Sequence, residues 1–226
     1  MRFLICRTEK IMAYNNFTLQ KLKKDFGLQV DEQSNLFAAV EPVAGSELLN
    51  TTLQETVQLA IAINTEKARS EMIISPVLLE VRRQAHGQIS LFSGTEFNVD
   101  EEKGLVGYCD YILSRSSEQL TINAPIILIT EAKNENIKAG LGQCIAGMVA
   151  AQQFNQQEEQ AIDTIYGAVT TGEIWKFLKL VNTIVSIDLT DYYILPNLNK
   201  ILGILLHSLQ LTNLTNQSPD SLPLNS

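Results

Sequence analysis

The sequence predicts an α/β protein in which helices flank a central mixed β-sheet. Two observations lead to this expectation. Apolar residues at helical spacing occupy the segments before residue 85 and after residue 136, and three short apolar segments typical of strands lie between them. The order is therefore helix, strand, strand, strand, helix, strand, with shorter additions at the end. With 226 residues, 45% of them hydrophobic and 19% charged, the chain is long enough for one domain with a full core.

The first 50 residues are expected to form an N-terminal extension packed on this domain. Residues 17–26 carry apolar side chains at helical spacing and are followed by Gly27, which predicts a short helix that ends at that glycine. Residues 35–45 are expected to be a strand or a loop. The domain proper is expected to span residues 51–211.

Two helices are predicted ahead of the strands. The first begins with Thr51 or Thr52 as its N-cap and continues to about Ile74. The dipeptide Ser75-Pro76 is typical of a new helix start, with serine as the cap and proline at the first helical position. A second helix is therefore predicted over residues 77–84.

Three strands follow, and their short connections favour an antiparallel meander. A helix rich in glycine and alanine comes next, which is slim enough to pack closely on a sheet. The last stretch of the chain is rich in Asn, Ser and Pro and is expected to be a disordered tail. In chain order, the expected elements are strands at 88–99, 105–114 and 126–133, a helix at 137–153, strands at 162–169, 174–178, 183–189 and 192–195, a helix at 198–211, and the tail at 212–226.

Composition and charge exclude several functional classes. The net charge of −8 argues against broad nucleic-acid affinity, although residues 1–24 are basic. No apolar stretch is long enough to span a bilayer, and no membrane partner is expected. Three cysteines without C-x-x-C spacing favour reduced thiols and a cytoplasmic protein. The two histidines, His86 and His207, are far apart in the sequence, which argues against a zinc site.

The residues that point to chemistry lie at the ends of two predicted strands. Glu131 and Lys133 close the apolar run that begins at Ile126, and their spacing puts them on one strand face together with Ile127 and Ile129. Asp110 ends the preceding strand and lies beside Glu131 if the two strands pair antiparallel. Two neighbouring carboxylates repel each other and therefore need a cation.

Oxygen ligands of this kind suit Mg²⁺ or Mn²⁺. Such a metal lowers the pKa of a bound water and offsets charge in a phosphoryl transition state. Lys133 is suited to hold the water or to donate to a phosphate oxygen. The alternative without a metal site is a surface salt bridge between Glu131 and Lys133 at the strand end, which would contribute little to stability.

The layout and these residues resemble the PD-(D/E)XK nuclease superfamily over residues 64–180. That resemblance implies a restriction-endonuclease-like α-β-β-β-α-β core, with Asp110 and Glu131 as metal ligands and Lys133 as the catalytic lysine. Cys109 stands where the family often has a proline before the first acid. The resemblance also implies an assisting acid on the first core helix and an assisting glutamine on the helix that follows. Glu71 is preferred for the acid, with Glu66 and Glu80 as competitors, and Gln143 is the glutamine.

The sequence therefore predicts a Mg²⁺-dependent (or Mn²⁺-dependent) endonuclease with DNA as its substrate. One alternative is a catalytically silent module of the same fold that binds a protein or a nucleic acid. Another is a structural module that forms a homodimer through the apolar helix at residues 198–211. The acidic charge and the lack of a recognisable DNA-binding domain support the catalytically silent module.

Overall fold

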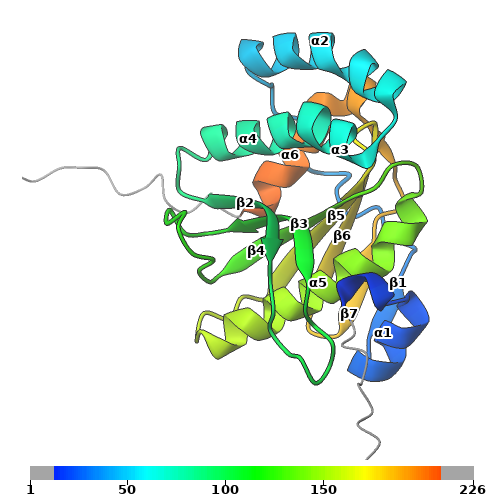
Figure 1. Cartoon of the computed structure of the whole chain (residues 1–226), viewed down its shortest axis with the longest axis vertical. Helices are drawn as coiled ribbons and strands as arrows, with labels where there is room; N and C mark the ends of the chain where they lie inside the picture. Colours follow the sequence, from blue (N-terminus) through cyan, green and yellow to red (C-terminus); the bar gives the residue numbers. More distant parts are fainter. Residues whose placement is uncertain (1–12, 210–226) are drawn as a thin grey trace, which may run out of the picture.

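One mixed eight-stranded sheet forms the centre of the computed structural model, which describes residues 13–209 (Figure 1). Its strand order is β1-β7-β6-β5-β4-β3-β2, and β8 pairs with β6 beside this path. Helices flank the sheet, so the predicted α/β class is confirmed. The strands are β1 (Gln29–Asp31), β2 (Ser90–Glu96), β3 (Tyr108–Ser114), β4 (Ile126–Ala132), β5 (Thr164–Thr170), β6 (Ile174–Val181), β7 (Ile184–Ile187) and β8 (Tyr192–Tyr193).

The helices form two layers, one on each face of the sheet. One apolar core lies under α2, α4 and α6, and a second lies between the sheet, α5 and the N-terminal segment (Figure 1). The helical elements are η1 (Tyr14–Asn16), α1 (Leu19–Phe26), α2 (Glu47–Ile63), α3 (Glu66–Arg69), the π-helical turn η2 (Ser70–Ile74), α4 (Ser75–Gln84), α5 (Ile137–Gln157) and α6 (Ile194–Ser208).

The predicted meander is confirmed. Strand β2 pairs antiparallel with β3, and β3 pairs antiparallel with β4. Helix α5 then carries the chain across one face, so that β5 lies parallel to β4, while β6 runs antiparallel to β5. Parallel neighbours need a long crossover, and the 21-residue α5 supplies it. Strand β4 is buried along its whole length because it lies inside the sheet and is covered on both faces.

The start of the long helix was predicted wrongly. Helix α2 begins one turn earlier than Thr51, with Ser46 as its N-cap, and the Ser46 hydroxyl accepts a hydrogen bond from the Leu49 backbone N–H at 3.2 Å. Ser46 also donates its own hydroxyl hydrogen bond to the buried Glu80 carboxylate at 2.8 Å. This long-range contact favours the earlier cap, and periodicity within the helix alone does not reveal it.

A new helix was predicted to start at Ser75-Pro76, and α4 does begin at Ser75, but Ser75 is not its cap and the chain is already helical before it. The break lies earlier, where Asn64 adopts a left-handed conformation and Thr65 caps α3. Helix α3, the π-helical turn and α4 then follow one another without interruption through Pro76. Proline has no N–H for the carbonyl one turn before it, that of Met72, and the Thr56 hydroxyl of α2 donates to that carbonyl at 2.7 Å. Neighbouring α2 therefore compensates for the proline.

The peripheral elements differ from expectation for local reasons. Residues 35–45 form turns and loop, while the short β1 before them was not predicted, because three residues are too few to show a period. Strand β1 pairs in parallel with β7 and so makes the N-terminal segment part of the sheet. Helix α6 starts at Ile194, four residues earlier than expected, and residues 212–226 lie outside the described part. No helix within residues 13–209 combines the length and apolar character needed to cross a membrane.

Strand β4 begins with an irregularity that changes which face its first residues occupy. Leu113 pairs with Leu128 and Ser114 pairs with Ile126, so Ile127 has no partner on β3. Ile127 consequently packs in the core under α2, α4 and α6, whereas Ile129 packs against α5. The expectation that both isoleucines share one face is therefore wrong, since one extra residue in a strand shifts the alternation.

Candidate functional site

Strands β3 and β4 separate at the position of the two predicted acids. Their last backbone pair toward this end is Tyr111 with Thr130, while β4 continues to pair with β5 through Ala132. The Asp110 carboxylate occupies the gap, where its Oδ2 accepts a hydrogen bond from the Ala132 N–H at 2.8 Å. A side chain thus replaces the missing backbone acceptor, and Asp110 is held beside Glu131.

Glu131 and Lys133 form an ion pair on the side of the sheet that α5 covers. Lys133 Nζ donates to Glu131 Oε1; the Glu131 side chain is 2% exposed and the Lys133 side chain 19% exposed. The Lys133 backbone N–H donates to the Thr170 carbonyl at 2.8 Å, which extends the β4–β5 pairing beyond Ala132. The pair is therefore set by the sheet and is not a solvated surface salt bridge.

Helix α5 approaches this pair closely at Gly140. A Cβ atom at that position would lie 3.1 Å from Lys133 Cγ and 2.6 Å from Val169 Cγ1. Any larger residue would push the lysine or the helix away, because such contacts are shorter than van der Waals separation. The glycine-rich start of α5, predicted to serve close packing, thus leaves room for the Lys133 side chain.

The two carboxylates and the lysine are electrostatically coupled. Burial raises the pKa of Glu131 to about 8, the neighbouring Asp110 carboxylate adds to the rise, and Lys133 opposes it. Burial acts to lower the pKa of Lys133, but the Glu131 carboxylate, with smaller contributions from Glu66 and Asp110, raises it overall. Burial and the second acid thus favour the protonated form of Glu131, whereas the contacting Lys133 ammonium and any bound metal ion favour the carboxylate.

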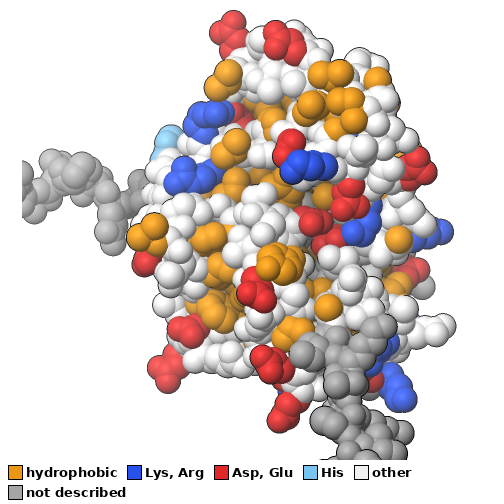
Figure 2. Space-filling model, viewed as in Figure 1, with side chains coloured by type: hydrophobic (Ala, Val, Ile, Leu, Met, Phe, Trp, Pro, Cys, Tyr) orange, Lys and Arg blue, Asp and Glu red, His pale blue; other side chains and the backbone are white. Residues whose placement is uncertain are grey.

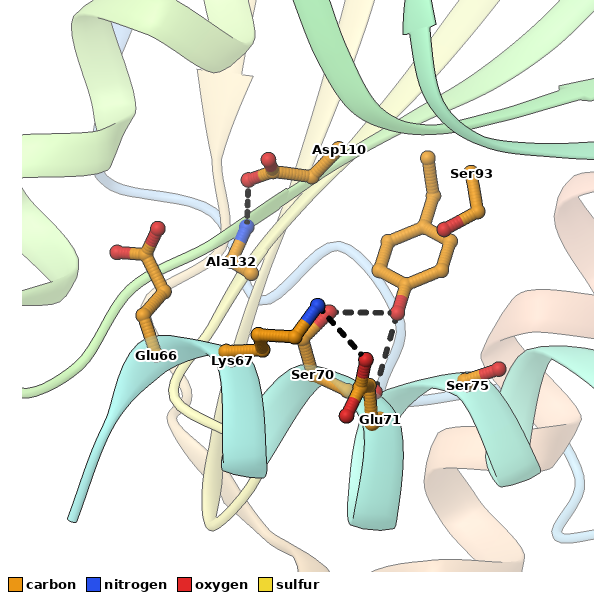
Figure 3. Close-up of a pocket in the computed structure, with 9 residues that line it drawn as sticks. Glu66, Lys67, Ser70, Glu71, Ser75, Ser93, Asp110 and Ala132 are labelled. Atoms are coloured by element: carbon orange, nitrogen blue, oxygen red, sulfur yellow. Dashed lines mark hydrogen bonds and ion pairs between the residues drawn. The ribbon is translucent and has the colours of Figure 1, made fainter.

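The three candidate acids on the first core helices have different surroundings. Glu66, in α3, lies close enough to raise the pKa of Lys133, and Figure 3 shows its carboxylate on the same side of the pocket as Asp110. Glu71, the preferred candidate, forms an ion pair with Lys67 at 2.9 Å and has a side chain that is 60% exposed. The buried Glu80 binds Ser46 and Arg83 instead. The geometry therefore favours Glu66 as the assisting acid.

A polar pocket of about 270 Å³ opens beside Asp110 (Figure 3). Figure 2 shows acidic and basic side chains gathered between α3 and the start of α5. Glu131 and Lys133 do not line this pocket, so Asp110 and Ala132 lie between the pocket and the Glu131–Lys133 ion pair. The pocket is lined by Glu66, Lys67, Ser70, Glu71, Ser75, Ser93, Asp110, Tyr111 and Ala132.

The hydroxyl groups of this pocket were not predicted from the sequence. The Ser70 hydroxyl lies 2.6 Å from the Tyr111 hydroxyl, which also donates to the Ser70 carbonyl at 3.0 Å. The π-helical turn that starts at Ser70 brings this residue to β3. Isolated serines carry no sequence signal, and only the position of the turn relative to β2 and β3 brings these groups together.

Gln143 lies on α5, one turn after Gly140. Gly140 and Gly147 both contact β4 or the residue after it, which places the intervening Gln143 toward the same side of the helix. Its side chain is half-buried. Within residues 13–209 it makes no hydrogen bond to Asp110, Glu131 or Lys133. Its assisting role thus stays a prediction.

The donor set fits a hard divalent cation that keeps part of its water shell. No three His, Cys, Asp or Glu side chains between residues 13 and 209 are grouped so that they form a metal cage. Asp110 and Glu131 offer carboxylate oxygens, and Mg²⁺ is commonly bound by one or two carboxylates together with water and substrate phosphates. The proton that burial and Asp110 keep on Glu131 is the one such an ion would displace.

Two residues that could in principle contact a base or a phosphate, Trp175 and Lys176, have structural roles instead. Trp175 is fully buried, and its indole N–H donates to the Gly172 carbonyl at 3.1 Å. Lys176 donates to three carbonyl groups in the loop after β7 and pairs with Asp191. Neither is available to contact a phosphate or a base.

Comparisons with known proteins assign no family to this chain. No protein-family model matches this chain, and no curated protein matches it in sequence. The class that the structure itself defines is an α/β protein with a buried carboxylate–lysine site where two central strands separate.

Proposed function

We propose that this protein is a Mg²⁺-dependent endonuclease of the PD-(D/E)XK type that acts on DNA and has a restriction-endonuclease-like fold. The observation that carries the proposal is the separation of β3 and β4, which brings Asp110, Glu131 and Lys133 together. The helix–strand–strand–strand–helix–strand order from α3 to β5 supports the same class. Mn²⁺ would serve the same ligands.

Each residue has a role that its position suits. Asp110 and Glu131 would hold the cation, which would offset the charge that develops on the phosphate during cleavage. Lys133 is oriented by Glu131 and by the close approach of Gly140, so its ammonium group can hold the attacking water or donate to a phosphate oxygen. Glu66 lies where it can support Lys133, and Gln143 is the proposed assisting glutamine on α5.

A cleavage assay tests this proposal. Wild-type protein is incubated with plasmid DNA and single-stranded DNA in Mg²⁺ or Mn²⁺, beside an Asp110→Asn variant. We expect the wild type to cleave and the variant to lose at least about 100-fold in rate, because a neutral amide is a far weaker cation ligand and leaves charge unbalanced. Absence of cleavage by the wild type on both substrates would support the catalytically silent module instead.

The raised pKa of Glu131 predicts a pH-dependent metal affinity. A cation must displace the proton of a group with a pKa of about 8, so the apparent affinity for Mg²⁺ should rise about tenfold per pH unit below that value and then level off. The measurement is the rise in Tm with added Mg²⁺ between pH 6 and pH 9. A Glu131→Gln variant should lose this dependence, and an unchanged pH profile would contradict the assignment.

The raised pKa of Glu131 also determines how the stability of the metal-free protein changes with pH. The pKa of Glu131 is raised from 4.5 to about 8 in the folded protein, so the folded state binds the proton more tightly than the unfolded chain. The contribution of this residue to stability is therefore fully present below about pH 4.5 and is lost as the pH rises to about 8. Added Mg²⁺ should offset this loss in the alkaline range.

A further inference from the structure

The positive charge of this acidic chain is concentrated near its beginning. Residues 1–24 contain six Lys or Arg residues and one Glu, although the whole chain has 17 basic and 25 acidic residues. Among the described residues, this excess is carried by Lys21, Lys23 and Lys24 of α1. The rest of the protein is correspondingly acidic and would repel a polyanion over most of its surface.

Helix α1 turns two of these lysines to solvent. Leu22 is the buried residue of the helix, at 1% exposure, whereas Lys23 and Lys24 are exposed. Lys21 is already engaged, since its ammonium group pairs with Asp25 and lies 5.5 Å from the Phe17 ring. Lys23 and Lys24 form no ion pair within residues 13–209, so their charge is available to a partner.

The segment that leads into α1 packs on α5, the helix that also contacts Lys133 of the proposed catalytic site. Gly142 of α5 touches the segment that leads into α1, because a Cβ there would lie 2.1 Å from the Phe17 carbonyl oxygen and 3.2 Å from Thr18 Cα. Gly140, two residues earlier on α5, touches the Lys133 side chain. Residues two apart face opposite sides of a helix, so α5 lies between α1 and Lys133, and Figure 1 shows α1 next to this helix.

A third cation without an ion pair among residues 13–209 lies on α5 itself. Lys138 belongs to the first turn of α5, two residues before Gly140, and is exposed. Figure 2 shows basic side chains over α1 at the lower right of the view. Together, Lys23, Lys24 and Lys138 form what we call the α1 basic surface. These lysines lie on α1 and on α5, the helix that also contacts Lys133.

We propose that the α1 basic surface binds the phosphate backbone of DNA held at the Asp110–Glu131–Lys133 site. This inference rests on the proposed nuclease function and assigns the substrate-binding surface that the function needs. Lysine–phosphate contacts release condensed counterions and supply most sequence-independent affinity for DNA. Charge complementarity selects a polyanion as the occupant, and an extended DNA backbone can contact groups on both sides of one helix, which is about 10–12 Å wide.

Fluorescence anisotropy with a short labelled DNA duplex, in EDTA, separates binding from cleavage. The test variant is Lys23→Ala/Lys24→Ala, and the control is Arg82→Glu, which changes the net charge by the same amount on α4, in the layer on the opposite face of the sheet. We expect the double variant to bind at least about tenfold more weakly at low salt. The slope of log K against log salt concentration should fall by about 1.8, or 0.9 for each lost phosphate contact. Lys138→Ala should remove about another 0.9.

Two outcomes would overturn the proposal: unchanged affinity and slope in the double variant, or an equal loss in Arg82→Glu. Binding of an acidic peptide but not of DNA by the wild type would assign the surface to a protein partner and would also overturn it. The cleavage assay is read independently. If the lysine variants lose DNA binding but the wild type does not cleave, the DNA-binding role of the α1 basic surface stands and the nuclease function is rejected. If the lysine variants cleave DNA at the wild-type rate, the nuclease function stands and the DNA-binding role of this surface is rejected.

Discussion

Replacing Lys133 with alanine is expected to reduce metal-dependent DNA cleavage by about 100-fold to 1,000-fold while the protein stays folded. The lysine lies beside the two carboxylates, and its ammonium group is the one cation that contacts Glu131 within residues 13–209. Its removal takes away the group that would hold water or stabilise charge on the phosphate. Initial cleavage rates in Mg²⁺ and Mn²⁺ measure the effect.

Lys67→Ala is the matched control for this substitution. Lys67 is also a lysine near the site, but it lines the neighbouring pocket and pairs with the exposed Glu71. We expect it to retain activity within about threefold, since exposed ion pairs contribute little. Cleavage that survives Lys133→Ala at the wild-type rate would show that the activity belongs to another site or to a contaminant.

Replacing Asn155 with alanine is expected to lower the free energy of unfolding by about 2–5 kcal/mol, because each buried backbone group left unpaired costs about 1–3 kcal/mol. Asn155 is 1% exposed, and its side chain satisfies both backbone groups of Ile126 at the start of β4. The Ile126 N–H donates to its Oδ1 at 2.7 Å, and its Nδ2 donates to the Ile126 carbonyl at 2.8 Å. Alanine recovers less than about 1 kcal/mol through helix propensity.

Urea unfolding of the variant and of a Gln156→Ala control measures this loss. Gln156 is the next residue of α5 and is exposed, so its replacement should change stability by less than about 0.5 kcal/mol. The m-value should stay constant in both variants if only stability changes. A loss below about 1 kcal/mol for Asn155→Ala would mean that the backbone groups of Ile126 find other hydrogen-bond partners. The proposed contribution of Asn155 to stability would then be rejected.

Asp110, Glu131 and Lys133 show how much of the candidate site could be predicted from the sequence alone. Glu131 and Lys133 could be placed on one strand face from their spacing, because strand alternation is a local rule. Their pairing with Asp110 required only that two consecutive strands run antiparallel, and short connections favour that arrangement. The assisting acid could not be chosen this way, since it lies on a helix whose start and register were unknown.

The choice between Glu66 and Glu71 depended on contacts between distant segments. The break at Asn64 and the π-helical turn at Ser70 set the orientation of the helices over β3. The hydroxyl of Thr56 compensates for Pro76, so the helix continues through a residue that usually marks a boundary. A propensity-based prediction ends the helix there because it contains no information about α2.

The amino-acid sequence by itself determined the α/β class, the meander of β2, β3 and β4, and the placement of Glu131 and Lys133 on one face of a buried strand. These follow from periodicity and short connections, which are local properties of the chain. Only the tertiary structure decided that β3 and β4 separate at Asp110, that Glu66 and Asp110 line one pocket, and that the segment before α1 packs on α5. Those features depend on packing between segments far apart in sequence, where backbone hydrogen bonds and close contacts at glycines outweigh local preference.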